Sequence, residues 1–182
     1  MKVCVLSSGS KGNSTLVITD KVKILIDLGT TTSYVEAALN NLNVDVKEIS
    51  HILITHSHVD HIKGLKVFIK RYNPVILVTE DMKNVLEKEL GNFRYEYYED
   101  KKAIIGDLTV NVIKTSHDAE ESIGFVLTNN NSSMVYITDT GYINQKYFKI
   151  LSNNNLYVLE SNHDIKMLMD GPYPYYLKQR VQ

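Results

Sequence analysis

The segment His56-Ser57-His58-Val59-Asp60-His61 places four potential metal-binding side chains within six residues. Imidazole and carboxylate groups are common protein ligands of zinc, iron and manganese. His56 and His58 alternate, so an extended backbone points both side chains the same way. Asp60 and His61 follow where the chain is expected to turn into a helix. The spacing therefore permits two neighbouring metal sites, one built on each pair.

Two residues elsewhere in the chain occupy positions suited to completing such sites. His117 comes just after a strand predicted at Leu108–Thr115, and Asp139 directly follows a strand predicted at Ser133–Thr138. A carboxylate carries two acceptor oxygens, so Asp139 is able to bridge two cations. Their shared place at strand ends makes both residues candidate ligands, although each alone is also an ordinary polar loop residue.

Hydrophobic periodicity predicts the elements that must position these side chains. Strands are expected at Lys2–Ser7, Ser14–Thr19, Val22–Asp27, His51–Thr55, Val75–Val78, Arg94–Tyr98, Leu108–Thr115, Ser122–Thr128, Ser133–Thr138 and Leu156–Glu160. Helices are expected from Tyr34 to Leu42 with Ser33 as N-cap, Ile62 to Tyr72, Thr79 to Leu90 with Gly91 as C-cap, and Gln145 to Leu151. A mixed first half and a largely β second half favour two sheets with helices outside them.

The composition is that of one globular domain spanning residues 1–182. Apolar residues make up 43%, and the formal net charge is −1. That charge excludes a global attraction to nucleic acid or membranes, so any polyanion must be bound locally. Cys4 has no partner for an internal disulfide and is expected to be buried on the first strand. With no apolar run long enough for a signal peptide or a membrane span, we expect a cytoplasmic protein without membrane contacts.

The H-x-H-x-D-H turn, followed by a lone histidine and then a lone aspartate, resembles the metallo-β-lactamase superfamily. Other segments resemble its bacterial YycJ/WalJ branch. These segments are the loop Ser7–Asn13, the strand ending at Asp27, Ser116–Ala119, Glu160–Asp164 and Gly171–Arg180.

The resemblance implies an α/β fold of the αββα sandwich type, with two mixed sheets. It also implies a site for two divalent ions of zinc, manganese or iron. The implied ligands are His56, His58 and His117 for one ion, Asp60 and His61 for the second, and Asp139 between them. Asp27 is expected to support the ligand turn from behind rather than to bind metal.

The same resemblance implies that the last strands and helices of the fold lie beyond residue 182. That part normally supplies a further histidine ligand and, in phosphodiesterases, a histidine that helps to protonate the leaving group. His163 remains open to three interpretations: it replaces that ligand, it lies beside the substrate, or it is an ordinary loop residue. An exposed sheet edge would favour aggregation or a dimer, and weak occupancy of the second metal would lower activity.

The function implied by the resemblance is 5′-to-3′ exonuclease action on DNA, through a hydroxide bound to two metals. Asp60 is the candidate to orient that hydroxide and accept its proton. The loop Ser8–Asn13, including Asn13, has backbone N–H groups suited to a phosphate, although a plain hairpin loop has the same composition.

Two further groups of side chains are candidate DNA contacts. They are Lys63, Lys66, Lys70 and Arg71, and the tyrosines Tyr173, Tyr175 and Tyr176. A solvated helix face and core or rim packing are the simpler interpretations of these groups. The alternative functions are hydrolysis of an ester, thioester or lactone by the same fold, and an inactive metal-binding fragment.

Overall fold

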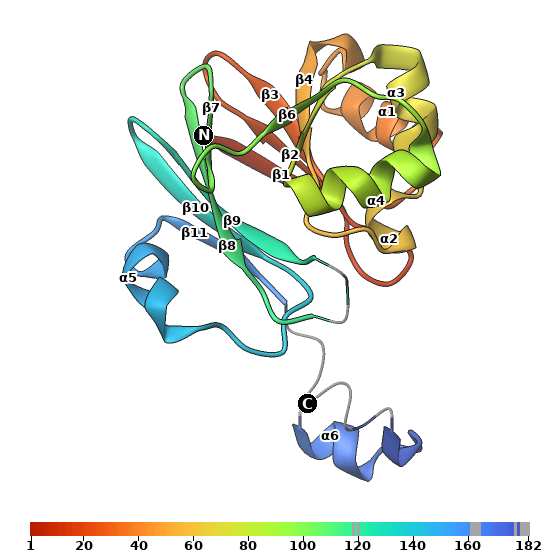
Figure 1. Ribbon diagram of the computed structural model, residues 1–182, viewed down its shortest axis with the longest axis vertical. Coiled ribbons are helices and arrows are strands. Elements are labelled where there is room, and N and C mark those ends of the chain that lie inside the picture. Colours follow the sequence, from red (N-terminus) through yellow and green to blue (C-terminus); the bar gives the residue numbers. More distant parts are fainter. Residues whose placement is uncertain (118, 120, 161–164, 177, 179–182) are drawn as a thin grey trace.

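Two β-sheets packed face to face form the centre of the molecule (Figure 1). The computed structural model describes residues 1–117, 119, 121–160, 165–176 and 178. In this part of the chain the first sheet has six strands, in the order β1 (Lys2–Ser7), β2 (Ser14–Ile18), β3 (Lys23–Ile26), β4 (Ile49–Leu53), β5 (Val75–Val78) and β6 (Tyr95–Tyr97). The second has five described strands, in the order β11 (Leu156–Leu159), β10 (Ser132–Ile137), β9 (Ile123–Asn129), β8 (Leu108–Lys114) and β7 (Lys102–Ile105).

Both sheets are mixed. In the first, β1, β2 and β3 pair antiparallel, whereas β3 to β6 run parallel. In the second, β7 to β10 pair antiparallel and β11 joins β10 in parallel. The two mixed sheets predicted from the sequence are therefore confirmed.

Helices cover the outer faces of both sheets. Figure 1 shows α1, α3 and α4 over the first sheet and α5 over the second. The described helices are α1 (Thr32–Asn41), α2 (Val59–Ile62), α3 (Leu65–Tyr72), α4 (Glu80–Leu90), α5 (Phe148–Leu151) and α6 (Ile165–Asp170), with short 3-10 turns at Val46–Glu48 and Gln145–Tyr147. The layer order is helix, sheet, sheet, helix. No helix among the described residues has the length and apolarity needed to cross a membrane.

The main core lies between the sheets and under the helices of the first sheet. β5 is a continuous apolar run because a parallel strand covered on both faces buries every side chain, and β3 is buried and apolar from Ile24 to Ile26. Phe68 from α3 and Phe125 from β9 are fully buried in this core. Cys4 is half-buried rather than buried, and it packs against the same cluster. The sheets are also joined by a backbone hydrogen bond of 3.0 Å from Ile123 N–H to the Thr55 carbonyl.

Local sequence signals explain the elements that were predicted closely. β5 has the predicted bounds, and α4 begins after Thr79, whose hydroxyl accepts a hydrogen bond of 3.3 Å from Met82 N–H. Gly91 ends the helix with φ +78°, a conformation that glycine adopts without steric cost.

The helix predicted from Ile62 to Tyr72 is instead two helices, α2 and α3, separated at Lys63 and Gly64. A Cβ at Gly64 would lie 2.3 Å from both the Leu28 side chain and the Thr30 carbonyl oxygen. The break therefore brings the backbone after the ligand turn against the loop that follows β3. Helical periodicity continues across the break and does not reveal it.

Three other expectations were wrong in detail. The N-cap of α1 is Thr31 rather than Ser33, since its hydroxyl accepts from Tyr34 N–H. β7 was not predicted, because it is a short and largely exposed strand that depends on pairing with β8. The described helix α6 was missed as well.

Candidate metal centre

The ligand turn leaves the first sheet at the carboxyl end of β4. Ile54 and Thr55 are fully buried, and His56 follows them with no exposed surface. His58 is the N-cap residue of α2, with extended backbone angles, and His61 lies inside that helix, also fully buried. The buried end of the strand and the short helix therefore fix the histidines of the turn from both sides.

Three histidines form the first cluster: His56, His58 and His117. One nitrogen from each lies within 4.8 Å of the other two. His58 Nδ1 is 3.2 Å from His117 Nε2, which brings a residue of the second sheet to the turn of the first. His56 Nε2 is buried and has no hydrogen-bond partner among the described residues. An unpaired buried nitrogen is costly unless a ligand satisfies it, and a metal ion does so.

The second cluster consists of His56, His61 and Asp139, whose ligand atoms again lie within 4.8 Å of one another. His61 Nε2 is 3.1 Å from Asp139 Oδ2 and 3.8 Å from Asp60 Oδ2. Asp139 follows β10 after Thr138 and has φ +52°, so its left-handed backbone conformation places its carboxylate next to the ligand turn. Asp60 is not part of either compact cluster, but it lies at the edge of the second one.

Asp27 and Thr55 hold the buried base of the turn. Asp27 has no exposed surface, and its carboxylate accepts hydrogen bonds from Thr55 N–H at 2.8 Å and from the Thr55 hydroxyl at 2.9 Å. The same carboxylate lies 2.8 Å from His61 Nδ1. Because Nδ1 faces Asp27, Nε2 is the nitrogen of His61 that would lose its proton and present a lone pair to a bound metal. This is the arrangement found where a carboxylate orients a metal-binding imidazole.

The charged groups of the two clusters favour the protonated, cationic form of the His61 imidazole. Burial lowers the pKa of His61, but the carboxylates of Asp27 and Asp139 outweigh it and raise the pKa to about 10. Burial and the positive charge of His61 lower the pKa of His56 to about 3. Burial raises the pKa of Asp139, but the hydrogen bond and the charge of His61 lower it to about 2. Two carboxylates thus attract positive charge into a buried pocket of imidazoles, as a divalent cation requires.

Close backbone contacts lock the turn onto the loop that contains Asn13. Asn13 N–H donates to the Asp60 carbonyl at 2.8 Å, and the Asn13 amide nitrogen lies 3.1 Å from His61 Nε2. Gly29 has to be glycine, because a Cβ there would lie 1.6 Å from the Asp60 carbonyl oxygen. Gly9 N–H and Gly12 N–H are occupied within the loop, by the Asn13 side chain and the Gly9 carbonyl. The loop therefore positions the ligand turn. The N–H groups of Gly9 and Gly12 are not available for the phosphate that the loop Ser8–Asn13 was expected to bind.

The structure thus gathers five of the six predicted ligands into the two clusters and leaves Asp60 beside them. Asn13 and Asp27 both contact His61, whereas His163 lies outside the described residues. Sequence reasoning missed Thr55, whose hydroxyl lies 3.1 Å from both His56 Nδ1 and His61 Nδ1. A threonine at the end of a buried strand gives no signal of such a role.

The structure also describes the two other groups of candidate DNA contacts, the basic residues after the ligand turn and the C-terminal tyrosines. Arg71 donates to Glu36 at 2.7 Å, and Lys66 donates to the Glu89 carbonyl at 2.9 Å, so half of the predicted basic group binds within the chain. Core packing of the C-terminal tyrosines is wrong, since all three side chains are exposed. They are Tyr173, Tyr175 and Tyr176.

A three-histidine cluster with one buried and two half-buried members, joined to a carboxylate at the seam of an αββα sandwich, defines a class of metallohydrolase fold. A family model described as the metallo-beta-lactamase superfamily matches residues 8–166. The chain belongs to the metallo-beta-lactamase superfamily, and within it to the YycJ/WalJ branch. Superfamily membership and the His/Asp clusters together indicate that it binds divalent metal.

Two curated relatives define that branch. The chain is 36% identical over 181 residues to exodeoxyribonuclease YycJ of Bacillus anthracis, covering 97% of this chain and 69% of that protein. It is 33% identical over 186 residues to exodeoxyribonuclease WalJ of Streptococcus pneumoniae, covering 99% and 69% respectively. Among solved structures, the metallo-beta-lactamase fold protein YhfI of Bacillus subtilis superposes with a TM-score of 0.69 at 18% identity, over 88% of this chain and 70% of that one. The last comparison supports the fold alone.

Proposed function

We propose that this chain is a metal-dependent phosphodiesterase that degrades DNA as a 5′-to-3′ exonuclease. The observation that carries the proposal is the pair of clusters that share His56 at the seam of the two sheets. Relatives that match almost the whole chain are named exodeoxyribonucleases, which supports DNA as the substrate.

The proposed centre holds two divalent ions. His56, His58 and His117 would hold one, and His61 with Asp60 the other, with Asp139 between them. Such ions, when bound, activate water and neutralise the negative charge of a phosphodiester. Imidazole and carboxylate ligands without a thiolate suit zinc, manganese or iron.

The protein side chains supply orientation and proton transfer. Asp27 keeps the Nε2 lone pair of His61 directed into the centre through the 2.8 Å contact with Nδ1. The Asp60 carboxylate is one-third exposed and lines the same hollow as Asp139 and Asn13. We assign Asp60 the role of accepting the proton of the attacking water. The buried imidazoles of His56 and His61 exclude bulk water from the base of the site.

The test begins with the metal content of protein purified without added metal, measured by elemental analysis. We expect one to two equivalents of zinc, manganese or iron, and a clear reduction in His58→Ala. His51→Ala is the matched control, because it removes an imidazole from β4 outside the clusters. Metal-loaded protein should then release the labelled nucleotide from single-stranded DNA sooner when the label is at the 5′ end than when it is at the 3′ end.

The possible outcomes separate the alternatives. Absence of bound metal in the unmodified protein, even after reconstitution, would overturn the proposal. Bound metal with hydrolysis of an ester, thioester or lactone but not of DNA would favour the acyl-hydrolase alternative. Bound metal without any hydrolysis would identify a metal-binding protein that is not an enzyme by itself.

A further inference from the structure

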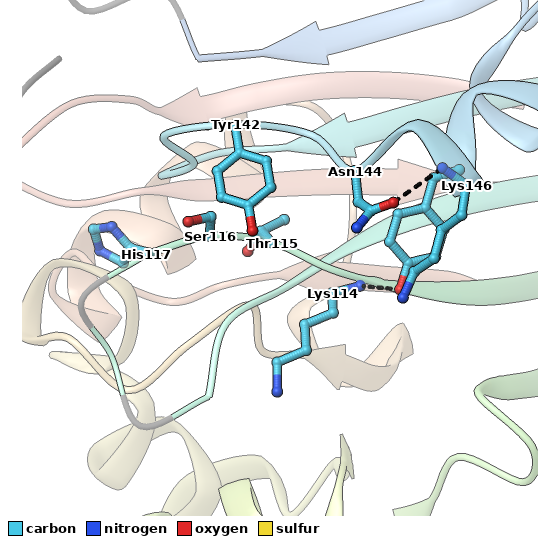
Figure 2. Close-up of a pocket in the computed structure, with 8 residues that line it drawn as sticks. Lys114, Thr115, Ser116, His117, Tyr142, Asn144 and Lys146 are labelled. Atoms are coloured by element: carbon cyan, nitrogen blue, oxygen red, sulfur yellow. Dashed lines mark hydrogen bonds between the residues drawn. The ribbon is translucent and has the colours of Figure 1, made fainter.

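A hollow of about 320 Å³ opens directly beside the first metal cluster (Figure 2). One wall is the end of β8 with Thr115, Ser116 and His117, and the other is the segment that follows Asp139. His117 belongs both to the cluster and to the lining of the hollow. The remaining lining residues are Lys114, Thr115, Ser116, Tyr142, Asn144, Lys146 and Tyr147.

Internal hydrogen bonds fix the shape of this hollow. Gly141 N–H donates to the Ser116 carbonyl at 2.7 Å, which ties the two walls together. Lys114 N–H donates to the Tyr147 hydroxyl at 3.2 Å, and the Asn144 side chain accepts from the backbone N–H of Lys146 at 3.0 Å (Figure 2). The hollow is therefore a formed feature of the fold rather than a gap between independent loops.

The side-chain chemistry of the hollow is cationic. Among the described residues, its lining contains two lysines and no carboxylate. Neither the Lys114 nor the Lys146 ammonium group forms an ion pair with a carboxylate of the described residues; Lys146 Nζ lies 4.9 Å from the ring centroid of Tyr147. Tyr142 is 66% exposed, so its ring is accessible at the rim. A chain with a net charge of −1 thus places two lysines next to its metal site.

A second hollow beside the centre has the reverse charge. This hollow, of about 550 Å³, is lined by Asp60, Asp139 and Glu160, together with the serine-rich loop from Ser7 to Ser10. A phosphate that is not bound to metal is repelled by these carboxylates and attracted by the lysines on the His117 side. The electrostatic potential therefore changes from negative in the larger hollow to positive in the hollow beside His117.

We propose that the basic hollow is a substrate subsite, which binds the DNA backbone phosphate next to the bond being cut. Lys114 and Lys146 contact that phosphate as point charges, and a base of the same strand stacks on Tyr142. Because His117 lines both places, a strand whose reacting phosphate lies at the metals has its neighbouring nucleotide in the hollow. This inference rests on the proposed function and names the residues that recognise the polymer.

The first test measures binding without catalysis. Fluorescein-labelled single-stranded DNA is titrated with metal-free protein in EDTA and followed by anisotropy. We expect Lys114→Gln/Lys146→Gln to weaken binding at least tenfold. It should also lower the slope of log affinity against log salt by about 0.7 for each lost phosphate contact. The control is Lys88→Gln/Lys102→Gln, which removes the same charge from exposed positions on α4 and β7 and should weaken binding less than twofold.

A second variant tests the stacking contact. Tyr142→Leu should weaken binding of the same DNA by about fivefold or more, the loss expected for one aromatic platform. Tyr97→Leu removes another exposed tyrosine, on β6 and outside the clusters, and should have little effect. Equal losses in the two lysine pairs, or no loss in Lys114→Gln/Lys146→Gln, would overturn the subsite.

The activity of metal-loaded protein distinguishes the subsite from the proposed function. Bis(p-nitrophenyl) phosphate has one phosphodiester and no neighbouring phosphate. Lys114→Gln/Lys146→Gln should therefore raise the KM for DNA at least fivefold more than the KM for this small diester. Parallel changes in both KM values would contradict a subsite for the neighbouring nucleotide. If the unmodified protein cleaves neither substrate, the proposed function fails while the anisotropy result still decides whether the hollow binds DNA.

Discussion

Asp27→Asn is the substitution that most directly tests how the centre is organised. Asp27 is fully buried and has φ +58°, a left-handed conformation that asparagine tolerates. The change therefore preserves side-chain shape and backbone angles and replaces one acceptor oxygen with an NH₂ group. Its effects report on the hydrogen bonds of that group rather than on a rebuilt turn.

The carboxylate receives three hydrogen bonds, from Thr55 N–H, from the Thr55 hydroxyl and from His61 Nδ1. An amide has a single acceptor oxygen, and the backbone N–H of Thr55 is able only to donate. If the oxygen of asparagine accepts from Thr55 N–H, its NH₂ group faces His61 Nδ1. His61 Nδ1 then has to accept, so the ring proton moves to Nε2, the nitrogen that faces Asp139 at 3.1 Å.

A proton on Nε2 opposes metal binding at the second cluster. Loss of such a carboxylate partner typically lowers metal affinity about 10- to 100-fold. That factor corresponds to about 1.4–2.7 kcal/mol of binding free energy. Because His61 belongs to the second cluster and not to the first, we expect one of two bound ions to weaken and the other to change little.

Competition with a fluorescent zinc chelator measures both dissociation constants in the unmodified protein and in Asp27→Asn. Asp20→Asn is the matched control, since Asp20 is exposed in the turn between β2 and β3. Far-UV circular dichroism establishes that the variant is folded. A folded Asp27→Asn protein with unchanged affinity for both ions would refute the view that Asp27 sets the tautomer of His61.

Three further perturbations test the packing, the titration and the metal linkage of the fold. Gly29→Ala should lower stability by about 1–3 kcal/mol and reduce metal content, because its Cβ would meet the Asp60 carbonyl at 1.6 Å; Gly141→Ala, with 3.7 Å of clearance, should be mild by chemical denaturation. Burial lowers the pKa of His51 despite the nearby Glu96, so the unfolded chain binds this proton first as pH falls. The stability present above about pH 6.5 is therefore lost as the pH falls below that value. His51→Gln should flatten the plot of the denaturation midpoint against pH between about pH 7 and pH 5. An unchanged plot would contradict this assignment. Zinc at a hundred times its Kd should add about 2.7 kcal/mol and raise the Tm by roughly 5–10 °C, and a Tm that EDTA does not lower would argue against a metal bound by the folded state.

Local patterns in the sequence were sufficient for much of the fold and for the ligand turn. The strand Val75–Val78 and the helix that begins after Thr79 have clear apolar runs and caps within a few residues. The alternation of His56 and His58 depends only on local backbone geometry. Features of this kind are encoded over short distances, which is why inspection of one chain recovers them.

Other features depend on contacts between distant segments, and no local pattern contains them. Thr55 reaches Asp27 only because β3 and β4 are neighbours. The break at Gly64 follows from the close approach of Leu28 and Thr30. The basic hollow brings together Lys114 at the end of β8 and Lys146 in the 3-10 turn Gln145–Tyr147, whereas the predicted basic residues were neighbours on one helix.

The placement of the ligands explains why the centre depends on the whole sandwich. His56, His58 and His61 follow a strand of the first sheet, whereas His117 and Asp139 follow strands of the second. Neither sheet alone supplies a compact cluster of three ligand atoms among the described residues. Closing the two sheets therefore completes the donor set, and a metal bound there stabilises the same interface. The hydrophobic core and the site that would carry the chemistry thus meet at the same seam between the sheets. The Thr55 carbonyl accepts from Ile123 N–H there.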